Sequence, residues 1–159
     1  MQRYLRTRGV SLIEVLIGIS IISVLLVVIG YSINTYVNAR ASLLNNTKAT
    51  YLAEEGLEII RAVRDNNWNT IDALPTNTTR YLSVSTTTFS IVTTPEVIDN
   101  NFYREFKVRP VYRNASDDIV ASTTAGASAD DGSRQIDMYV GGPAGTTTMQ
   151  AIITNLYAI

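Results

Sequence analysis

Near its N-terminus the chain carries a long apolar stretch, and beyond it polar and apolar positions alternate. Residues 10–33 (VSLIEVLIGISIISVLLVVIGYSI) contain one charged side chain, Glu14. As a helix this stretch would extend about 36 Å, enough to cross the roughly 30 Å hydrocarbon core of a membrane. No proline occurs before Pro75, so no proline interrupts a helix that continues into the polar region. The pattern therefore predicts an N-terminal helix whose first part is transmembrane or buried in an assembly.

After the apolar stretch the sequence remains compatible with a helix, but only one side of that helix is apolar. Apolar or small residues recur at spacings of three and four, which places them on one face. Glu54 and Glu58 fall on the other side. We predict one helix over about residues 10–63, with residues 34–64 as its amphipathic continuation packed on a sheet. The apolar face consists of Tyr36, Ala39, Leu43, Ala53, Leu57 and Ile60, widened by Ala49, Leu52, Ile59 and Val63.

Residues 65–159 have the composition of a β-sheet domain that packs on this helix. Runs rich in Thr, Val, Ile, Tyr and Phe are expected to be strands. Residues 65–77 and 115–133 are rich in turn-forming residues and are expected to be loops. Pro110 is expected to bend or fray its strand. About four or five antiparallel strands thus follow the helix, and the predicted fold class is α+β. The expected strands are residues 79–85, 87–93, 102–112, 135–140 and 147–156.

Composition narrows the functional classes. The 159 residues hold 13 Lys+Arg, 14 Asp+Glu, no Cys and no His. The lack of Cys excludes disulfides and thiolate metal sites, and the lack of His removes the commonest general base and metal ligand. Because no recognisable carboxylate pair or catalytic motif remains, we expect neither an enzyme nor a cofactor. The net charge of -1 gives no overall attraction to nucleic acid.

The charges at the N-terminus are segregated, and three hypotheses account for them. A cleaved secretory signal would use the small residues around Arg40, but its apolar region normally has about 7–15 residues. A plain signal anchor explains the length and the basic leader. It does not explain Glu14, because an acid inside a membrane is costly and usually marks function. The leader, residues 1–9, contains no acid and carries Arg3, Arg6 and Arg8, which would hold this end in the cytoplasm.

The third hypothesis uses all of these features. Residues 8–16 (RGVSLIEVL) resemble the class III signal of type IV pilins and type II secretion pseudopilins. In that family a short basic leader ends in glycine, and prepilin peptidase cuts after it on the cytoplasmic face. The resemblance implies cleavage after Gly9 and N-methylation of Val10, where the family often has Phe. It also implies that Glu14 neutralises the N-terminal amine of a neighbouring subunit.

The resemblance further implies a pilin fold and a structural role as a filament subunit. The filament would be type IV pilus-like or type II secretion-like. Residues 53–68 (AEEGLEIIRAVRDNNW), 134–140 (RQIDMYV) and 149–157 (MQAIITNLY) resemble minor pilins and pseudopilins more than major subunits. The precursor would lie in the cytoplasmic membrane with residues 65–159 outside the cytoplasm, before entering an extracytoplasmic filament or the cell surface. Its partners would be the membrane, prepilin peptidase, other pilin or pseudopilin subunits and, indirectly, an assembly ATPase and a platform protein. Two alternatives remain: a competence pseudopilin that binds DNA, and a signal-anchored extracytoplasmic protein that forms no filament.

Two further groups of side chains are weak candidates for binding. One group of carboxylates would offer oxygen ligands to Ca²⁺, as in some pseudopilins, but its spacing fits no EF-hand loop, and solvated turn residues are the favoured interpretation. These are Asp117, Asp118, Asp130 and Asp131. A basic group interleaved with aromatic residues would suit DNA: Arg104, Lys107, Arg109 and Arg113. Alternation along a strand places Arg104 on the opposite face from Lys107 and Arg109, which favours a half-exposed sheet face instead.

Overall fold

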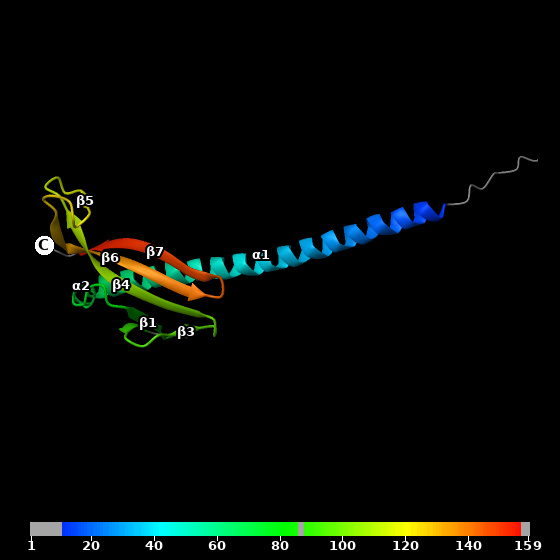
Figure 1. Ribbon diagram of the computed structural model, residues 1–159. Coiled ribbons are helices and arrows are strands. Elements are labelled where there is room, and N and C mark those ends of the chain that lie inside the picture. The colour runs from blue at the N-terminus through cyan, green and yellow to red at the C-terminus, as the bar shows by residue number, and fades with distance from the viewer. Residues whose placement is uncertain (1–10, 86–87, 157–159) are drawn as a thin grey trace, which may run out of the picture. The chain divides into compact units, whose positions relative to one another are not determined.

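The chain forms one long helix followed by an antiparallel sheet, and the computed structural model describes residues 11–85 and 88–156. Helix α1 (Leu12–Asn66) is followed by the short helix α2 (Trp68–Asp72) and, within the described residues, seven strands (Figure 1). The predicted α+β class and long N-terminal helix are confirmed. The chain divides into two compact units between Ala41 and Ser42, a boundary that falls inside α1.

The sheet is antiparallel throughout, with the strand order β2-β1-β4-β6-β7. Two further strands of two residues each, β3 and β5, pair with the ends of β4. The five strands of this path agree with the four or five predicted from the sequence. The sequence does not predict β3 and β5, because a strand of two residues leaves no periodic pattern. The bounds are β1 Arg80–Val84, β2 Phe89–Val92, β3 Val97–Ile98, β4 Phe102–Arg113, β5 Ile119–Val120, β6 Ser128–Gly142 and β7 Gly145–Thr154.

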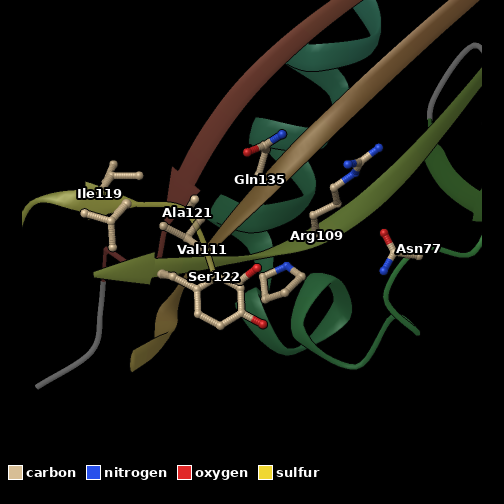
Figure 2. A pocket seen from close by; sticks show the side chains of 10 residues that line it. Asn77, Arg109, Val111, Ile119, Ala121, Ser122 and Gln135 are labelled. Atoms are coloured by element: carbon tan, nitrogen blue, oxygen red, sulfur yellow. The ribbon is translucent and has the colours of Figure 1, made fainter. Parts of the chain in front are cut away.

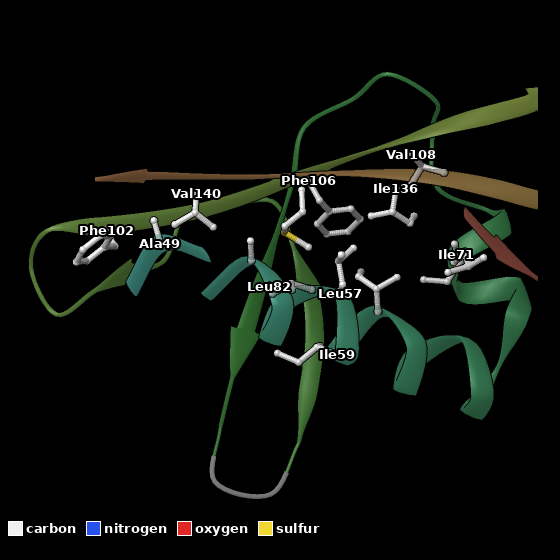
Figure 3. Close-up of a cluster of buried hydrophobic side chains, with 14 residues drawn as sticks. Ala49, Leu57, Ile59, Ile71, Leu82, Phe102, Phe106, Val108, Ile136 and Val140 are labelled. Atoms are coloured by element: carbon white, nitrogen blue, oxygen red, sulfur yellow. The ribbon is translucent and has the colours of Figure 1, made fainter. Parts of the chain in front are cut away.

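The hydrophobic core of the second unit lies between α1 and the sheet (Figure 3). Burial on α1 follows the spacing of three and four residues, as the apolar face predicted. The face is buried only from Ala49 onward. Its earlier members Tyr36, Ala39 and Leu43 are exposed. Helical periodicity identifies an apolar face but not where a partner covers it. The core residues of α1 are Ala49, Ala53, Leu57, Ile59 and Ile60, and those of the sheet include Leu82, Phe106, Val108, Ile136, Met138 and Val140.

Two segments expected as loops contain regular structure. Residues 65–77 include α2, whose first turn is capped by Asn67: its Oδ1 accepts from the Asn69 N–H at 3.0 Å. Ile71 of α2 is fully buried, which holds the segment on the core. Residues 115–133 include β5 and the beginning of β6. In both places tertiary pairing and burial outweigh a composition that favours turns.

The strand that contains Pro110 is irregular at that residue, as the sequence predicted. The register between β4 and β6 shifts between Pro110 and Val111. Pro110 lies opposite Arg134, whereas Val111 lies opposite Asp130. Residues 131–133 of β6 therefore have no direct partner on β4, and the strand bulges there.

Candidate functional site

Glu14 lies in the first turn of α1. Its backbone N–H donates to Ser11 O at 2.9 Å, and the N–H of Val15 donates to the same oxygen at 3.2 Å. Ser11 therefore stands at the N-cap and Glu14 at the third helical position, which is the spacing of a capping box. A carboxylate here is also favoured by the helix dipole. The Ser-x-x-Glu spacing is visible in the sequence.

The predicted processing signal falls on residues that the structure does not describe. Gly9 and Val10 lie outside the described residues, as do Arg3, Arg6 and Arg8. The structure therefore supplies the geometry of Glu14 and of the helix that follows it, while the leader rests on the sequence.

The part of α1 that follows Glu14 presents a continuous apolar surface. From Leu12 to Val37 every Leu, Ile, Val and Tyr side chain is exposed. This stretch of helix is long and apolar enough to cross a membrane, by length and composition.

The serine and threonine hydroxyl groups within this apolar stretch are satisfied by the helix itself. Ser20, Ser23 and Ser32 each donate to the carbonyl oxygen four residues earlier at 2.8 Å. Thr35 does the same at 3.0 Å. Because a lipid environment offers no partner to a polar group, these bonds adapt the stretch to an apolar surrounding.

The four basic candidates on β4 do not form one surface. Arg104 is buried on the face toward α1, where its Nη1 donates to Glu55 Oε2 at 2.9 Å and to Leu52 O at 3.0 Å. Lys107 lies on the opposite face, with its Nζ 5.8 Å from the centre of the Tyr139 ring. The predicted separation of Arg104 from Lys107 and Arg109 is confirmed.

Arg109 lies beside a hollow of about 420 Å³ on the face of β4 away from α1. Figure 2 shows Arg109 and Gln135 at this hollow. Both contact the fully buried Asp137: Gln135 Nε2 donates to its Oδ1 at 2.7 Å, and Arg109 Nε lies 2.5 Å from its Oδ2, an ion pair without the alignment of a hydrogen bond. The guanidinium charge is therefore balanced by a buried carboxylate. Nothing in the sequence pattern indicated this pair, because Asp137 sits on a strand that reads as half-exposed.

Arg113, the fourth basic candidate for DNA binding, contacts two of the acidic candidates for Ca²⁺ binding. Its Nε lies 2.7 Å from Asp130 Oδ2, and its Nη1 donates to Asp117 O at 2.8 Å. The hydrogen bond from Arg113, followed by those from Ser133 and the Gly132 N–H, lowers the pKa of Asp130 below its ordinary value. The same contact raises the pKa of Arg113.

Three of the four acidic candidates, Asp117, Asp118 and Asp130, are engaged in turn and strand contacts. Asp118 Oδ2 accepts from Asn114 Nδ2 at 3.2 Å, and Asp130 Oδ1 accepts from the Gly132 N–H at 2.9 Å. Asp131 lies next to these on the bulged part of β6. Within residues 11–85 and 88–156, no three or more acidic side chains converge in a way that would hold a metal ion.

Comparison with known proteins adds one finding. Residues 5–30 match the family described as the prokaryotic N-terminal methylation motif. The match spans the predicted cleavage position at Gly9, the residue to be methylated, Val10, and the acid Glu14. Neither the curated proteins nor the solved structures gave a match. Together with the apolar helix, this motif indicates a membrane-anchored precursor that prepilin peptidase processes.

Proposed function

The N-terminal methylation motif, the apolar helix and the antiparallel sheet together fit the type IV pilins and pseudopilins, and on this basis we propose that the chain is a structural subunit of a type IV pilus-like or type II secretion-like filament. The observation that carries the proposal is the motif at residues 5–30. Its part from Leu12 onward belongs to α1, whose apolar side chains are exposed from Leu12 to Val37. An apolar surface of that extent needs a membrane or other subunits to cover it. In the proposed function the membrane covers this surface before assembly, and neighbouring subunits cover it afterwards.

The position of Glu14 supports assembly through the N-terminal helix. It is the one charged residue between Val10 and Ile33. A carboxylate in apolar surroundings is costly unless a cation pairs with it. Cleavage after Gly9 would create such a cation, the amine of Val10, on each neighbouring subunit. Pairing the two groups would set the position of each incoming subunit along the filament.

We propose a structural role and not an enzymatic one, with residues 65–159 outside the cytoplasm. A chain without His or Cys lacks the side chains that most often serve as general base, nucleophile or metal ligand. Among the described residues, no observation specifically favours DNA binding, since Arg104 is buried against Glu55 and Arg109 is paired with Asp137.

The mass of the mature N-terminus tests processing. The full chain would be expressed in bacteria with and without prepilin peptidase, and its intact mass measured. We expect a chain that begins at Val10 and is one methyl group heavier, only when the peptidase is present. Gly9→Val should block cleavage, whereas Gly18→Val, the same change inside the helix, should not.

Other termini would contradict the proposal in different ways. A chain that keeps Met1 would indicate a simple signal anchor. A chain that begins near Ser42 would indicate a secreted protein without the apolar helix.

Incorporation into filaments tests the role of Glu14. We expect Glu14→Gln to be cleaved normally but to be absent from sheared filaments, because the amide carries no charge to pair with the amine. Glu58→Gln, on the exposed side of the same helix, is the matched control and should be incorporated. Normal incorporation of Glu14→Gln would exclude the proposed pairing.

A further inference from the structure

Strand β7 is an open edge of the sheet. Within the described residues it pairs with β6 only. The Asn155 N–H donates to Gly132 O at 2.8 Å, in the same register as the β6–β7 ladder. Backbone groups alternate in direction along an antiparallel strand, so the odd-numbered residues of β7 face β6. The N–H and C=O groups of the even-numbered residues face away from the sheet, among them those of Thr146, Thr148, Gln150 and Ile152.

This edge lacks the features that usually prevent strand pairing. Natural edge strands are protected by Lys, by Pro, by bulges or by being short. β7 has 10 residues (GTTTMQAIIT) with no charge and no proline. Its register with β6 runs without a shift from Gly142 and Gly145 to Ser133 and Thr154. The strand is therefore long, regular and suited to accept a further strand.

A hollow of about 450 Å³ lies between this strand and the exposed side of α1. Met149 lines it from β7, and Tyr51, Glu54 and Glu58 are among the residues that line it from α1. Side chains point alternately to the two faces of a sheet. Alternate side chains of a strand added to β7 would therefore point toward α1 and enter this hollow.

The hollow has a negative charge. Glu55 lies 2.9 Å from Arg104, and Glu58 pairs with Arg61. Glu54 is exposed and has no ion-pair partner among the described residues. A basic side chain entering from an added strand would provide that partner.

We propose that β7 binds an extended segment of a partner polypeptide as an additional strand, with a Lys or Arg side chain of that segment reaching Glu54. Backbone hydrogen bonds to the even-numbered residues of β7 provide the affinity, and the charge of Glu54 selects a basic segment. A second copy of β7 fits less well, because β7 is uncharged and would leave Glu54 unpaired. This inference does not depend on filament formation, since all of its residues lie in the second unit.

Hydrogen exchange with a synthetic peptide tests the proposal. The full chain in detergent micelles would be mixed with a peptide of about ten residues, the length of β7, that alternates threonine and lysine. We expect slower exchange at the amides of Thr146, Thr148, Gln150 and Ile152. Amides of the odd-numbered residues of β7, which already face β6, should change little. A peptide with glutamate in place of lysine should bind less tightly.

Two substitutions separate the roles of backbone and charge, with affinity measured by fluorescence anisotropy. Gln150→Pro removes one outward N–H and leaves the ladder with β6 intact, and should weaken binding about tenfold. Glu54→Gln should weaken binding about two- to fivefold, the range of one exposed ion pair. Glu58→Gln, which removes a carboxylate that Arg61 already pairs, is the matched control and should have a smaller effect.

A backbone N-methylated lysine peptide keeps the test valid even if Gln150→Pro does not fold. This peptide has the same charge, but it cannot donate hydrogen bonds to β7, and its N-methyl groups keep its backbone carbonyls from approaching the β7 amides. If it protects the four amides as well as the parent peptide does, or if the parent peptide protects none, strand addition is excluded. If protection appears without peptide and rises with protein concentration, the occupant is a second copy and the basic partner is excluded.

Discussion

At the residue scale, two adjacent glycines of β6 allow aromatic side chains of β4 to lie against the strand. A Cβ atom on Gly142 would lie 2.5 Å from the ring of Phe102, and one on Gly141 would overlap the ring of Tyr103. Phe102 belongs to the core, whereas the side chain of Tyr103 is 46% exposed. The same substitution at the two glycines therefore meets one ring that is fixed and one that is free to turn into solvent.

This difference predicts unequal effects of Gly→Ala at the two positions. Gly142→Ala should lower the free energy of unfolding by about 1–3 kcal/mol, the usual cost of overpacking a core. Gly141→Ala should lower it by less, because Tyr103 rotates away. Denaturation of the full chain in detergent, followed by the fluorescence of its one tryptophan, Trp68, measures both values. An equal or reversed order would contradict the assignment of the two rings.

The contact between Arg104 and Glu55 is the second residue-scale feature. Arg104 is 2% exposed, and its Nε has no hydrogen-bond partner among the described residues. Its Nη1 depends on Glu55 and on the carbonyl oxygen of Leu52. Glu55 is 52% exposed, so water compensates for part of any loss. The charge of Arg104 nevertheless has one acidic partner, and that partner lies on α1.

Removing the charge of Glu55 should therefore destabilise the packing of the sheet on α1. We expect Glu55→Gln to lower the free energy of unfolding by about 1–2 kcal/mol, since it weakens the support of a buried cation. Glu58→Gln should cost less than about 0.5 kcal/mol, because its partner Arg61 is exposed. The same denaturation experiment compares them. If both variants lowered the free energy of unfolding by similar amounts, Arg104 would not depend on the carboxylate of Glu55.

At the scale of elements, Arg113 connects the end of β4 to β6 and to the turn before β5. It contacts Asp130 of β6 and the carbonyl oxygen of Asp117 in that turn. Asp117 has a φ of 66°, a left-handed conformation that Asp tolerates better than most residues. This contact joins the segment that the sequence predicted as a loop to the regular sheet.

The lowered pKa of Asp130 predicts a pH dependence. A carboxylate whose pKa is lower in the folded state contributes stability that is fully present above its unfolded pKa of about 3.9. That contribution is lost as the pH falls through the lower folded value. The stability difference between the natural chain and Asp130→Asn should therefore shrink as the pH falls from about 5 toward 2. Unfolding measured at several pH values tests this, with Asp131→Asn as the neighbouring control. A difference that stays constant with pH would contradict the role of Asp130.

The elements differ in how far the sequence predicts them, and the reason is physical. The long helix follows from local periodicity and from the absence of proline, and the strands of the main path follow from β-branched and aromatic residues. β5 forms because residues 112–113 pair with residues 119–120 across a turn. The beginning of β6 forms because residues 128–130 pair with residues 111–113. A composition rich in turn-forming residues indicates neither pairing. α2 is buried through Ile71 although its surroundings resemble a loop. Likewise, the pairing of Arg104 with Glu55 joins residues far apart in the sequence.

At the scale of the whole molecule, the chain combines two parts with opposite preferences for solvent. The sheet and the end of α1 bury an ordinary core, whereas the start of α1 exposes apolar side chains to whatever surrounds it. The N-terminal motif can be recognised from the sequence alone, because its signal is chemical and local: a basic leader, Gly9, and an acid at a fixed distance. The sequence does not predict that β7 lies at an open edge, because this depends on the strand order of the complete sheet.

The apolar stretch of α1 leads to a quantitative prediction about membrane insertion. Residues 12–33 contain 15 Leu, Ile and Val residues, which together favour insertion by about 5–9 kcal/mol at about 0.3–0.6 kcal/mol each. One arginine at the centre of a helix opposes insertion by about 2.5–3.5 kcal/mol. Leu25→Arg alone should therefore leave the full chain in the membrane. Ile21→Arg combined with Leu25→Arg should cancel most of the favourable free energy and release much of the chain.

Alkaline carbonate extraction of membranes, followed by immunoblotting of the pellet and the supernatant, measures the released fraction. The double variant Leu43→Arg with Leu44→Arg is the control, because it adds the same charge at exposed positions beyond the apolar stretch. We expect this control to remain in the pellet with the natural chain and with Leu25→Arg. If the control is released as completely as the Ile21 and Leu25 double variant, added charge anywhere along α1 detaches the chain, and residues 12–33 are not the membrane-spanning segment. If all three variants remain in the pellet, another part of the chain holds it to the membrane.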